Sequence, residues 1–192
     1  MTDLIPDKGA ERKRAAARRK MAHELASDPG QALIRHMPGL SEGAAVSGYL
    51  PIRSEIDPVP LMTWLFDLGH PICVPVIEAQ AMPLKFRAWS PDTVLIEGAY
   101  GAAIPETGEW VEPDVLLVPL LSFDRRGFRL GYGGGFYDRT LQELRANKTV
   151  MAIGLAYADQ EVDAVPIEPT DQRLDAMLTE QGLIEMPTKE MS

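Results

Sequence analysis

A short apolar run followed by a glycine-rich segment constrains the fold of this chain more than any other feature. Residues 115–121 read VLLVPLL and are bounded by Asp114 on one side and Ser122 on the other. A continuous apolar run of this length is typical of a strand that is buried on both faces, as in the middle of a parallel sheet. It is far shorter than the ~20 residues that a membrane-spanning helix needs. We therefore expect a central strand in a layered fold.

The rest of the chain alternates helical and extended patterns. Helices are expected at residues 11–26, 31–36, 59–68 and 136–146, and strands at 44–52, 72–77, 84–89, 115–121, 149–156 and 175–179. Residues 90–113 are punctuated by proline and glycine and are expected to form a long irregular connection. The alternation predicts a three-layer α/β fold, with a mainly parallel sheet and helices on both faces in a Rossmann-like arrangement. No repeat or linker interrupts it, so we expect residues 1–192 to form a single domain.

Composition favours a protein of a reducing compartment. The single cysteine, Cys73, excludes a disulfide framework. No apolar stretch follows a positively charged start at the N-terminus, so we expect no secretory signal and a cytoplasmic location. The net charge of −9 argues against broad contact with nucleic acid, and no segment is apolar enough for a membrane.

The segment after the central strand, GFRLGYGGGFYDR at residues 127–139, has the composition of an anion-binding loop. It follows the carboxyl end of a strand, which is where open α/β sheets bind their ligands. Its glycines allow a close approach of backbone N–H groups to a ligand, and the helix that follows adds free N–H groups. Phe136 and Tyr137 stand where a Walker A loop has its lysine and hydroxyl residue, so that motif is excluded. Arg129 and Asp138 offer an anion partner and a Mg²⁺ ligand, which favours a phosphate site over a purely structural turn.

Basic residues are concentrated at the start of the chain, with seven Lys and Arg in residues 1–20. In the expected helix, Arg14 and Arg18 share a stripe with Met21 and Leu25. We therefore expect Met21 and Leu25 to face the core, the two arginines to lie along its edge, and Arg12 and Arg19 to point elsewhere. Spacing alone leaves two interpretations equally open: a solvated basic face, or an anion-binding group.

Assembled in this way, the sequence resembles the 5-formyltetrahydrofolate cyclo-ligase family, also called methenyltetrahydrofolate synthetases. The similarity is carried by the long and specific block VPLLSFDRRGFRLGYGGGFYDRTL at residues 118–141. Weaker similarity extends to the basic N-terminal helix and to the segments YLPIRSEID (49–57), VPVI (74–77) and YADQEVDAVPIEPTDQRLDAMLTE (157–180). The resemblance implies an ATP- and Mg²⁺-dependent ligase that converts 5-formyltetrahydrofolate to 5,10-methenyltetrahydrofolate and releases ADP and phosphate. It implies small-molecule partners, and we expect a monomer.

The resemblance also implies a role for each matching residue. For the nucleotide it implies Arg129, Gly131, Tyr132, Gly133, Gly134, Gly135, Phe136 and Asp138. The family has a basic residue followed four positions later by Arg in its first helix, and Arg14 and Arg18 fit this spacing, with Lys13 as a competitor. For the metal it implies Asp138 and Asp171, and for catalysis Arg129, Tyr137 and Glu55. For the folate it implies Glu55, Tyr137, Met82 and Phe86, although burial in the core is the favoured interpretation of Met82 and Phe86.

The chain departs from the family's pattern in the glycine loop. Some members have Arg and Lys where this chain has Tyr132 and Gly134, so less positive charge surrounds the phosphates and the first helix has to supply more. Ile77 stands where some members have an aromatic residue, which leaves the stacking partner of the pterin open. Two other functions also stay open: a folate- or nucleotide-binding protein without turnover, and a sugar-phosphate isomerase of similar architecture.

Overall fold

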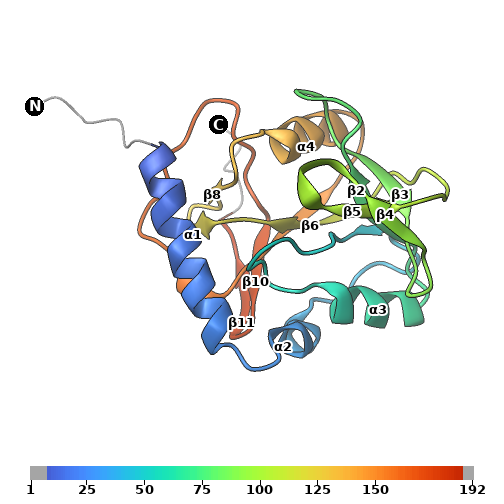
Figure 1. Ribbon diagram of the computed structural model, residues 1–192, viewed down its shortest axis with the longest axis horizontal. Helices are drawn as coiled ribbons and strands as arrows, with labels where there is room; N and C mark the ends of the chain where they lie inside the picture. The colour runs from blue at the N-terminus through green and yellow to red at the C-terminus, as the bar shows by residue number, and fades with distance from the viewer. Residues whose placement is uncertain (1–7, 188–192) are drawn as a thin grey trace, which may run out of the picture.

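Figure 1 shows the computed structural model of the protein, which describes residues 8–187. Its helices are α1 (Lys8–Leu25), α2 (Pro29–His36), α3 (Val59–Asp67) and α4 (Phe136–Asn147), with 3-10 turns η1 (Ala99–Gly101) and η2 (Ala158–Gln160). The strands of the main sheet are β1 (Val46–Ser47), β2 (Ile72–Val76), β3 (Lys85–Ala88), β6 (Val115–Pro119), β9 (Met151–Leu155), β10 (Ala176–Thr179) and β11 (Gly182–Glu185). Two hairpins complete the fold: β4 (Leu95–Glu97) with β5 (Ala103–Pro105), and β7 (Ser122–Phe123) with β8 (Arg129–Leu130).

The main sheet has seven strands in the order β11-β10-β9-β6-β1-β2-β3. The five inner strands run parallel to one another, and the edge strands β3 and β11 are antiparallel to their neighbours. Within residues 8–187, no helix is long and apolar enough to cross a membrane. The first residues of the chain, on which the prediction of no secretory signal depends, lie outside the described part.

The side chains of β6 show how the predicted central strand is buried. Val115 and Leu117 point to the face that α2 and α3 cover, and Leu116 and Val118 point to the face that α4 covers. Each fully buried aliphatic side chain of this kind contributes about 1.5–3 kcal/mol, since it is removed from water on folding. The predicted three-layer α/β fold with a mainly parallel sheet is thereby confirmed.

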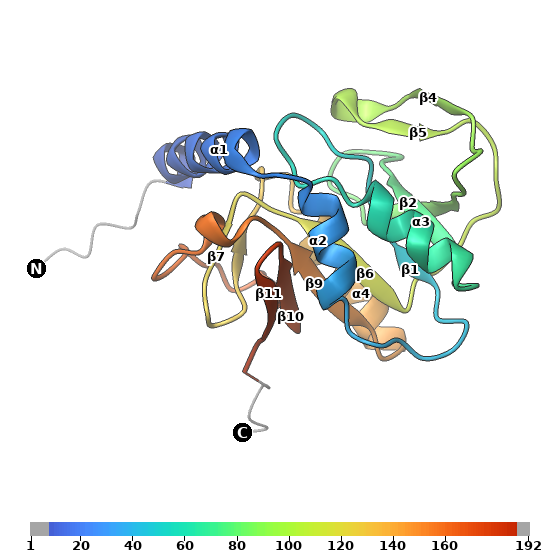
Figure 2. The same ribbon diagram turned by 90° about the horizontal axis from the view of Figure 1, so that it is seen from below.

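Two segments of the predicted strand pattern differ from the structure. The expected strand at 44–52 shrinks to β1, because the chain leaves the sheet at Gly48, where a Cβ would collide with Met62. The expected irregular connection at 90–113 contains the β4–β5 hairpin, which stands beside the main sheet in Figure 2. The hairpin escaped prediction because all three residues of β4 are exposed, so no alternation of buried and exposed positions marks it.

The connections that leave the carboxyl ends of the parallel strands all reach one edge of the sheet. β1 leads into residues 48–58, β6 leads into the β7–β8 hairpin and the glycine loop, and β9 leads into residues 156–175. Helix α1 lies across this edge (Figure 1). Four parts of the chain that are distant in sequence therefore meet where an open α/β sheet binds its ligands.

Candidate active site

The glycine loop at residues 131–135 has the backbone that its sequence predicts. Gly133 and Gly135 have φ angles of 100° and 64°, in the left-handed region that favours glycine. Gly135 is also the N-cap residue of α4 and provides no side-chain cap. The first N–H groups of α4 are therefore available to an anion at this point.

Two arginines bind carbonyl oxygens of this loop. Arg12 donates from Nε to the carbonyl of Gly131 at 3.1 Å, and Arg139 donates from Nη2 to the carbonyl of Gly134 at 2.6 Å. Both guanidinium groups therefore lie against the loop, where they add positive charge. Arg139, in the first turn of α4, was not among the predicted site residues. It partly replaces the charge that the loop lacks at Tyr132 and Gly134.

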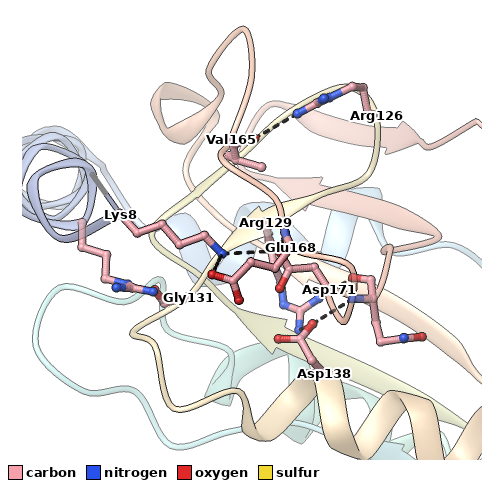
Figure 3. Close-up of polar contacts among 10 residues, drawn as sticks. Lys8, Arg126, Arg129, Gly131, Asp138, Val165, Glu168 and Asp171 are labelled. Carbon is pink, nitrogen blue, oxygen red and sulfur yellow. Dashed lines mark hydrogen bonds and ion pairs between the residues drawn. The ribbon is translucent and has the colours of Figure 1, made fainter. Parts of the chain in front are cut away.

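Arg129 and Asp138, the pair that brackets the glycines, are in direct contact (Figure 3). Arg129 donates from Nη2 to Asp138 Oδ1 at 2.8 Å, and the backbone N–H of Gln172 donates to the same oxygen at 2.9 Å. The Arg129 side chain is only 5% exposed, so Asp138 neutralises a buried cation. The second carboxylate oxygen, Oδ2, accepts no hydrogen bond from residues 8–187 and is free for another cation.

The segment at residues 157–172 brings Asp171 next to this pair. The buried Asp124 accepts a hydrogen bond from the backbone N–H of Val165 at 2.9 Å, and Arg126 donates to the carbonyl of Val165 at 3.0 Å (Figure 3). Gln172, which binds Asp138 and Arg129, directly follows Asp171 in the sequence. These contacts fix the segment on the glycine-loop side of the sheet, so the backbone next to Asp171 meets Asp138. The Asp171 Oδ2 itself accepts the backbone N–H of Glu168 at 2.7 Å.

The chemistry of these two carboxylates fits Mg²⁺. The described residues hold no group of three or more His, Cys, Asp and Glu side chains that could bind a metal ion. Mg²⁺ is usually held by one or two carboxylates, with water and substrate phosphates as its remaining ligands. Asp138, whose Oδ2 accepts no hydrogen bond from residues 8–187, and Asp171, from the neighbouring segment, are the carboxylates near the glycine loop that could contribute to such a donor set.

Helix α1 begins three residues earlier and ends one residue earlier than the predicted helix at 11–26, and the predicted orientation of its faces is wrong. The residues that face the body are Ala15, Arg19 and Ala22, while Met21 and Leu25 are 64% and 80% exposed. Arg14 is exposed and pairs with Glu11 at 2.8 Å, so it does not lie along the core. Arg18, half-buried, has its Nη2 3.6 Å from Glu11.

The basic residues of α1 that reach the glycine-loop backbone and Asp171 are Lys8 and Arg12, whereas Arg19 lies beside Glu55. Lys8 Nζ lies 2.9 Å from Glu168 and 3.6 Å from Asp171 (Figure 3), while Arg12 binds the glycine loop. Lys8 and Arg12 have the same four-residue spacing as Arg14 and Arg18. The four-residue spacing therefore occurs at two places in this helix, and spacing alone does not distinguish one turn of the helix from the other.

Glu55 is buried beside the glycine loop and is only 5% exposed. Its Oε2 accepts the backbone N–H of Ile52 at 2.9 Å, its Oε1 accepts the hydroxyl of Tyr132 at 3.0 Å, and Arg19 Nη1 lies 3.8 Å from Oε1. Burial raises the pKa of Glu55, and the hydrogen bond from Ile52 and the charge of Arg19 partly oppose that rise. The carboxylate is thus buried but supported by donors on several sides.

Tyr137 carries a buried hydroxyl group that has no hydrogen-bond partner among residues 8–187. Burial raises its pKa well above the usual range, so the phenol stays neutral and keeps its proton. A buried donor without a partner costs about 1–3 kcal/mol, which a bound ligand with an acceptor atom would recover. The predicted folate-side position of Tyr137 fits this unused donor.

Met82 and Phe86, the two predicted pocket walls, have different surroundings. Phe86 is buried and packs in the core that α4 covers, as the favoured interpretation predicted. Met82 is 55% exposed, so the prediction that it belongs to the core is wrong. A contact of either side chain with folate stays a prediction.

Fold and site together define a class of protein, an α/β protein with a glycine loop suited to a phosphate-bearing ligand next to a buried carboxylate. Comparison with known proteins identifies the group within that class. The model of the 5-formyltetrahydrofolate cyclo-ligase family matches residues 5–180, and the chain belongs to this family. The resemblance seen in the sequence is therefore confirmed, and the chain is a ligase by homology.

Individual relatives support the same conclusion over most of the chain. The 5-formyltetrahydrofolate cyclo-ligase of Mycolicibacterium smegmatis is 34% identical over 87% of this chain and 90% of its own length. The 5-formyltetrahydrofolate cyclo-ligase of Escherichia coli K12 is 34% identical over 84% of this chain and 93% of its own length. The solved structure of 5,10-methenyltetrahydrofolate synthetase from Aquifex aeolicus superposes with a TM-score of 0.75 and 26% identity, covering 96% of this chain and 95% of that one.

Proposed function

We propose that the protein catalyses the ATP- and Mg²⁺-dependent cyclisation of 5-formyltetrahydrofolate to 5,10-methenyltetrahydrofolate, with release of ADP and phosphate. Family membership supports this reaction, and one structural observation carries it. The loop suited to a triphosphate and the buried acid suited to a pterin are joined by the hydrogen bond between Tyr132 and Glu55. A phosphate donor and a folate bound at these two places would be neighbours.

The reaction requires activation of a poor electrophile. The carbon of an N-formyl group resists attack because the amide nitrogen donates electrons to it. In the proposed mechanism the formyl oxygen attacks the γ-phosphorus of ATP and ADP leaves, which gives a phosphorylated imidate. N10 of the folate then attacks the activated carbon and releases its proton, and the C–O bond breaks so that phosphate departs with the former formyl oxygen. Catalysis of this kind depends mainly on positioning and on neutralising phosphate charge.

The residues around the glycine loop provide that neutralisation. We assign phosphate binding to the N–H groups of residues 131–136 and to Arg129, with Lys8 and Arg12 as the basic pair of α1. Arg14 is no longer the favoured member of that pair, because Glu11 already neutralises it at the surface. Asp138 and Asp171 would hold Mg²⁺, which supplies charge stabilisation at the phosphates when it is bound.

Glu55 and Tyr137 are proposed to hold the folate. The Glu55 carboxylate presents acceptor lone pairs for N–H donors of the pterin ring. The neutral Tyr137 hydroxyl provides one donor, which is aligned by the first turn of α4. The buried setting of both groups excludes water from the formyl group and from the phosphorylated intermediate, which water would otherwise hydrolyse.

We also propose that residues 1–192 act as one catalytic domain and as a monomer in the cytoplasm. Size-exclusion chromatography with light scattering tests this part separately, and a stable dimer at micromolar concentration would contradict it.

The activity is tested by following the absorbance of 5,10-methenyltetrahydrofolate formed from 5-formyltetrahydrofolate. Product should form only when ATP and Mg²⁺ are both present, and ADP should appear in equal amount. Folded protein that binds both ligands without forming product would be a binding protein, the first alternative. Folded protein that binds neither ligand would contradict the proposal in full.

A further inference from the structure

Tyr132 connects the two halves of the site through one hydrogen bond. It lies in the glycine loop between Gly131 and Gly133, and its hydroxyl donates to Glu55 Oε1 at 3.0 Å. Glu55 belongs to the connection after β1, 77 positions earlier in the chain. The segment that would contact phosphate and the acid that would contact folate are therefore linked directly.

Polar contacts define the position of the Tyr132 side chain. The ring is 40% exposed, so apolar burial alone does not fix it. The guanidinium carbon of Arg19 lies 5.4 Å from the ring centroid, and that of Arg53 lies 5.8 Å from it. Arg19 also reaches Glu55, so the aromatic ring, the carboxylate and the buried cation form one cluster.

The hydrogen bond from Tyr132 also sets the direction in which Glu55 presents its oxygens. The backbone N–H of Ile52 occupies Oε2 and the Tyr132 hydroxyl occupies Oε1. With one donor on each oxygen, the carboxyl plane has one preferred rotation, and its remaining lone pairs keep a fixed direction. A shift of the glycine loop would move the donor and would release this rotation.

We propose that Tyr132 is a positioning residue that couples occupancy of the glycine loop to the orientation of Glu55, so that nucleotide and folate bind cooperatively. The proposal rests on the proposed function and deepens it. A triphosphate that orders the loop places the Tyr132 hydroxyl on Glu55, and an oriented Glu55 favours the folate. By linkage, bound folate favours the nucleotide by the same factor.

The same contact influences the proton affinity of Glu55. The groups that face this carboxyl are Arg19 from α1, Arg53 and the Ile52 N–H from its own connection, Tyr132 from the glycine loop, Tyr137 from α4, and Tyr49. Burial raises the pKa of Glu55, whereas the hydrogen bond from Tyr132 lowers it because the donor stabilises the ionised form. Removal of the Tyr132 hydroxyl should therefore raise the pKa of Glu55 further. As the pH is lowered, the Glu55 carboxylate then becomes protonated at a higher pH than in the wild type.

The decisive variant is Tyr132→Phe, which keeps the ring and its contacts with the arginines and removes only the hydroxyl. Tyr100→Phe is the matched control, because it also removes one hydroxyl and keeps the ring. Tyr100 is 63% exposed, its ring contact with Phe136 is retained, and within residues 8–187 its hydroxyl bonds neither Glu55 nor the glycine loop. The dissociation constant of 5-formyltetrahydrofolate is measured by calorimetry with and without a non-hydrolysable ATP analogue and Mg²⁺. The pH profile of kcat/KM is measured for the same three proteins, and their thermal unfolding is recorded.

In the wild type and in Tyr100→Phe, the analogue should tighten folate binding about tenfold, within the usual range of site coupling. In Tyr132→Phe, the analogue should tighten folate binding by a factor close to one. The acid limb of the pH profile of kcat/KM should move to higher pH. The proposal would be overturned if the analogue still tightened folate binding about tenfold in Tyr132→Phe, or if the acid limb of its pH profile did not move. It would also be overturned if the analogue had no effect on folate binding in the wild type. A wild type that forms no product from ATP and folate would instead contradict the proposed function, so the two failures are distinguishable.

Discussion

Arg12 and Gly131 are 119 positions apart in the sequence, yet the Nε of Arg12 donates to the carbonyl of Gly131 at 3.1 Å. The contact attaches the first helix to the glycine loop. The guanidinium group of Arg12 also lies against Gly133, because a Cβ added to Gly133 would be 3.1 Å from Arg12 Cζ. One arginine thus supports two positions of the loop.

Substitution of Arg12 tests which turn of α1 serves the nucleotide. Arg12→Ala removes a charged donor whose hydrogen bond is worth about 1.5–3 kcal/mol, so the KM for ATP should rise about tenfold or more. Arg14→Ala removes an equal charge from the same helix but breaks only a surface pair with Glu11. Its KM for ATP should stay within about twofold of the wild type. If the two variants were equally impaired, general charge on α1 and not the position of Arg12 would be responsible.

Gly133 combines a positive φ with a close neighbour, Arg12, and is therefore expected to tolerate a side chain poorly. Gly133→Ala places a Cβ at a φ of 100° and pushes it against Arg12, so it should lower the free energy of unfolding by about 1–2 kcal/mol and weaken ATP binding. Gly131→Ala is the control for stability, since no atom lies within 4 Å of its added Cβ. Urea denaturation measures both variants. Equal free energies of unfolding for Gly133→Ala and Gly131→Ala would contradict the prediction, because they would show that alanine adopts the Gly133 conformation without strain.

Asp138 has two roles that different substitutions separate. Asp138→Ala leaves the buried Arg129 without its partner and should destabilise the protein by about 3 kcal/mol or more. Asp138→Asn keeps an oxygen acceptor for Arg129 and should be less destabilised, but it loses the charge that attracts Mg²⁺. We expect both variants to lose most turnover and only the first to lose much stability. Near-normal turnover of Asp138→Asn at limiting Mg²⁺ would disprove the assigned metal role.

Cys73 provides a built-in probe of ligand binding. Its side chain is fully buried, and burial raises the pKa of the thiol to about 12, so the native protein at pH 8 should not react with a thiol reagent. Cys73 is the chain's single thiol, so any reaction reports opening of the sheet around β2. Ligands at 100 times their dissociation constants should slow the reaction about 100-fold. Rapid labelling of the folded protein would show that this part of the sheet opens easily.

The conformation of the glycine loop was predictable from the sequence because it is local. Gly133, Gly135, Arg129 and Asp138 lie within ten positions of one another, and the strand before them has an unambiguous apolar pattern. The structure adds the partners of these residues, such as the backbone of Gln172. Such partners depend on the path of the chain between distant elements, which no local pattern encodes.

The orientation of α1 was not predictable, because its buried face contradicts the usual preference of side chains. Arg19 is 1% exposed, while the apolar Met21 and Leu25 face solvent. The burial of Arg19 is possible because Ser54 and the carbonyl of Leu120 accept its hydrogen bonds and Glu55 balances its charge. These partners are 35 to 101 positions away, so the helix sequence alone could not indicate them.

Helix α1 carries Arg12 for the glycine loop and Arg19 for Glu55, about 10 Å apart along its axis. Its own buried face is small, with two alanines beside Arg19. Helix α1 therefore contacts both parts of the proposed active site, and few apolar side chains hold this helix on the rest of the protein. Local unfolding of this one helix would remove contacts from both proposed substrate sites while the sheet behind them stayed folded. The enzyme should therefore lose activity at a lower denaturant concentration than the one that unfolds the sheet.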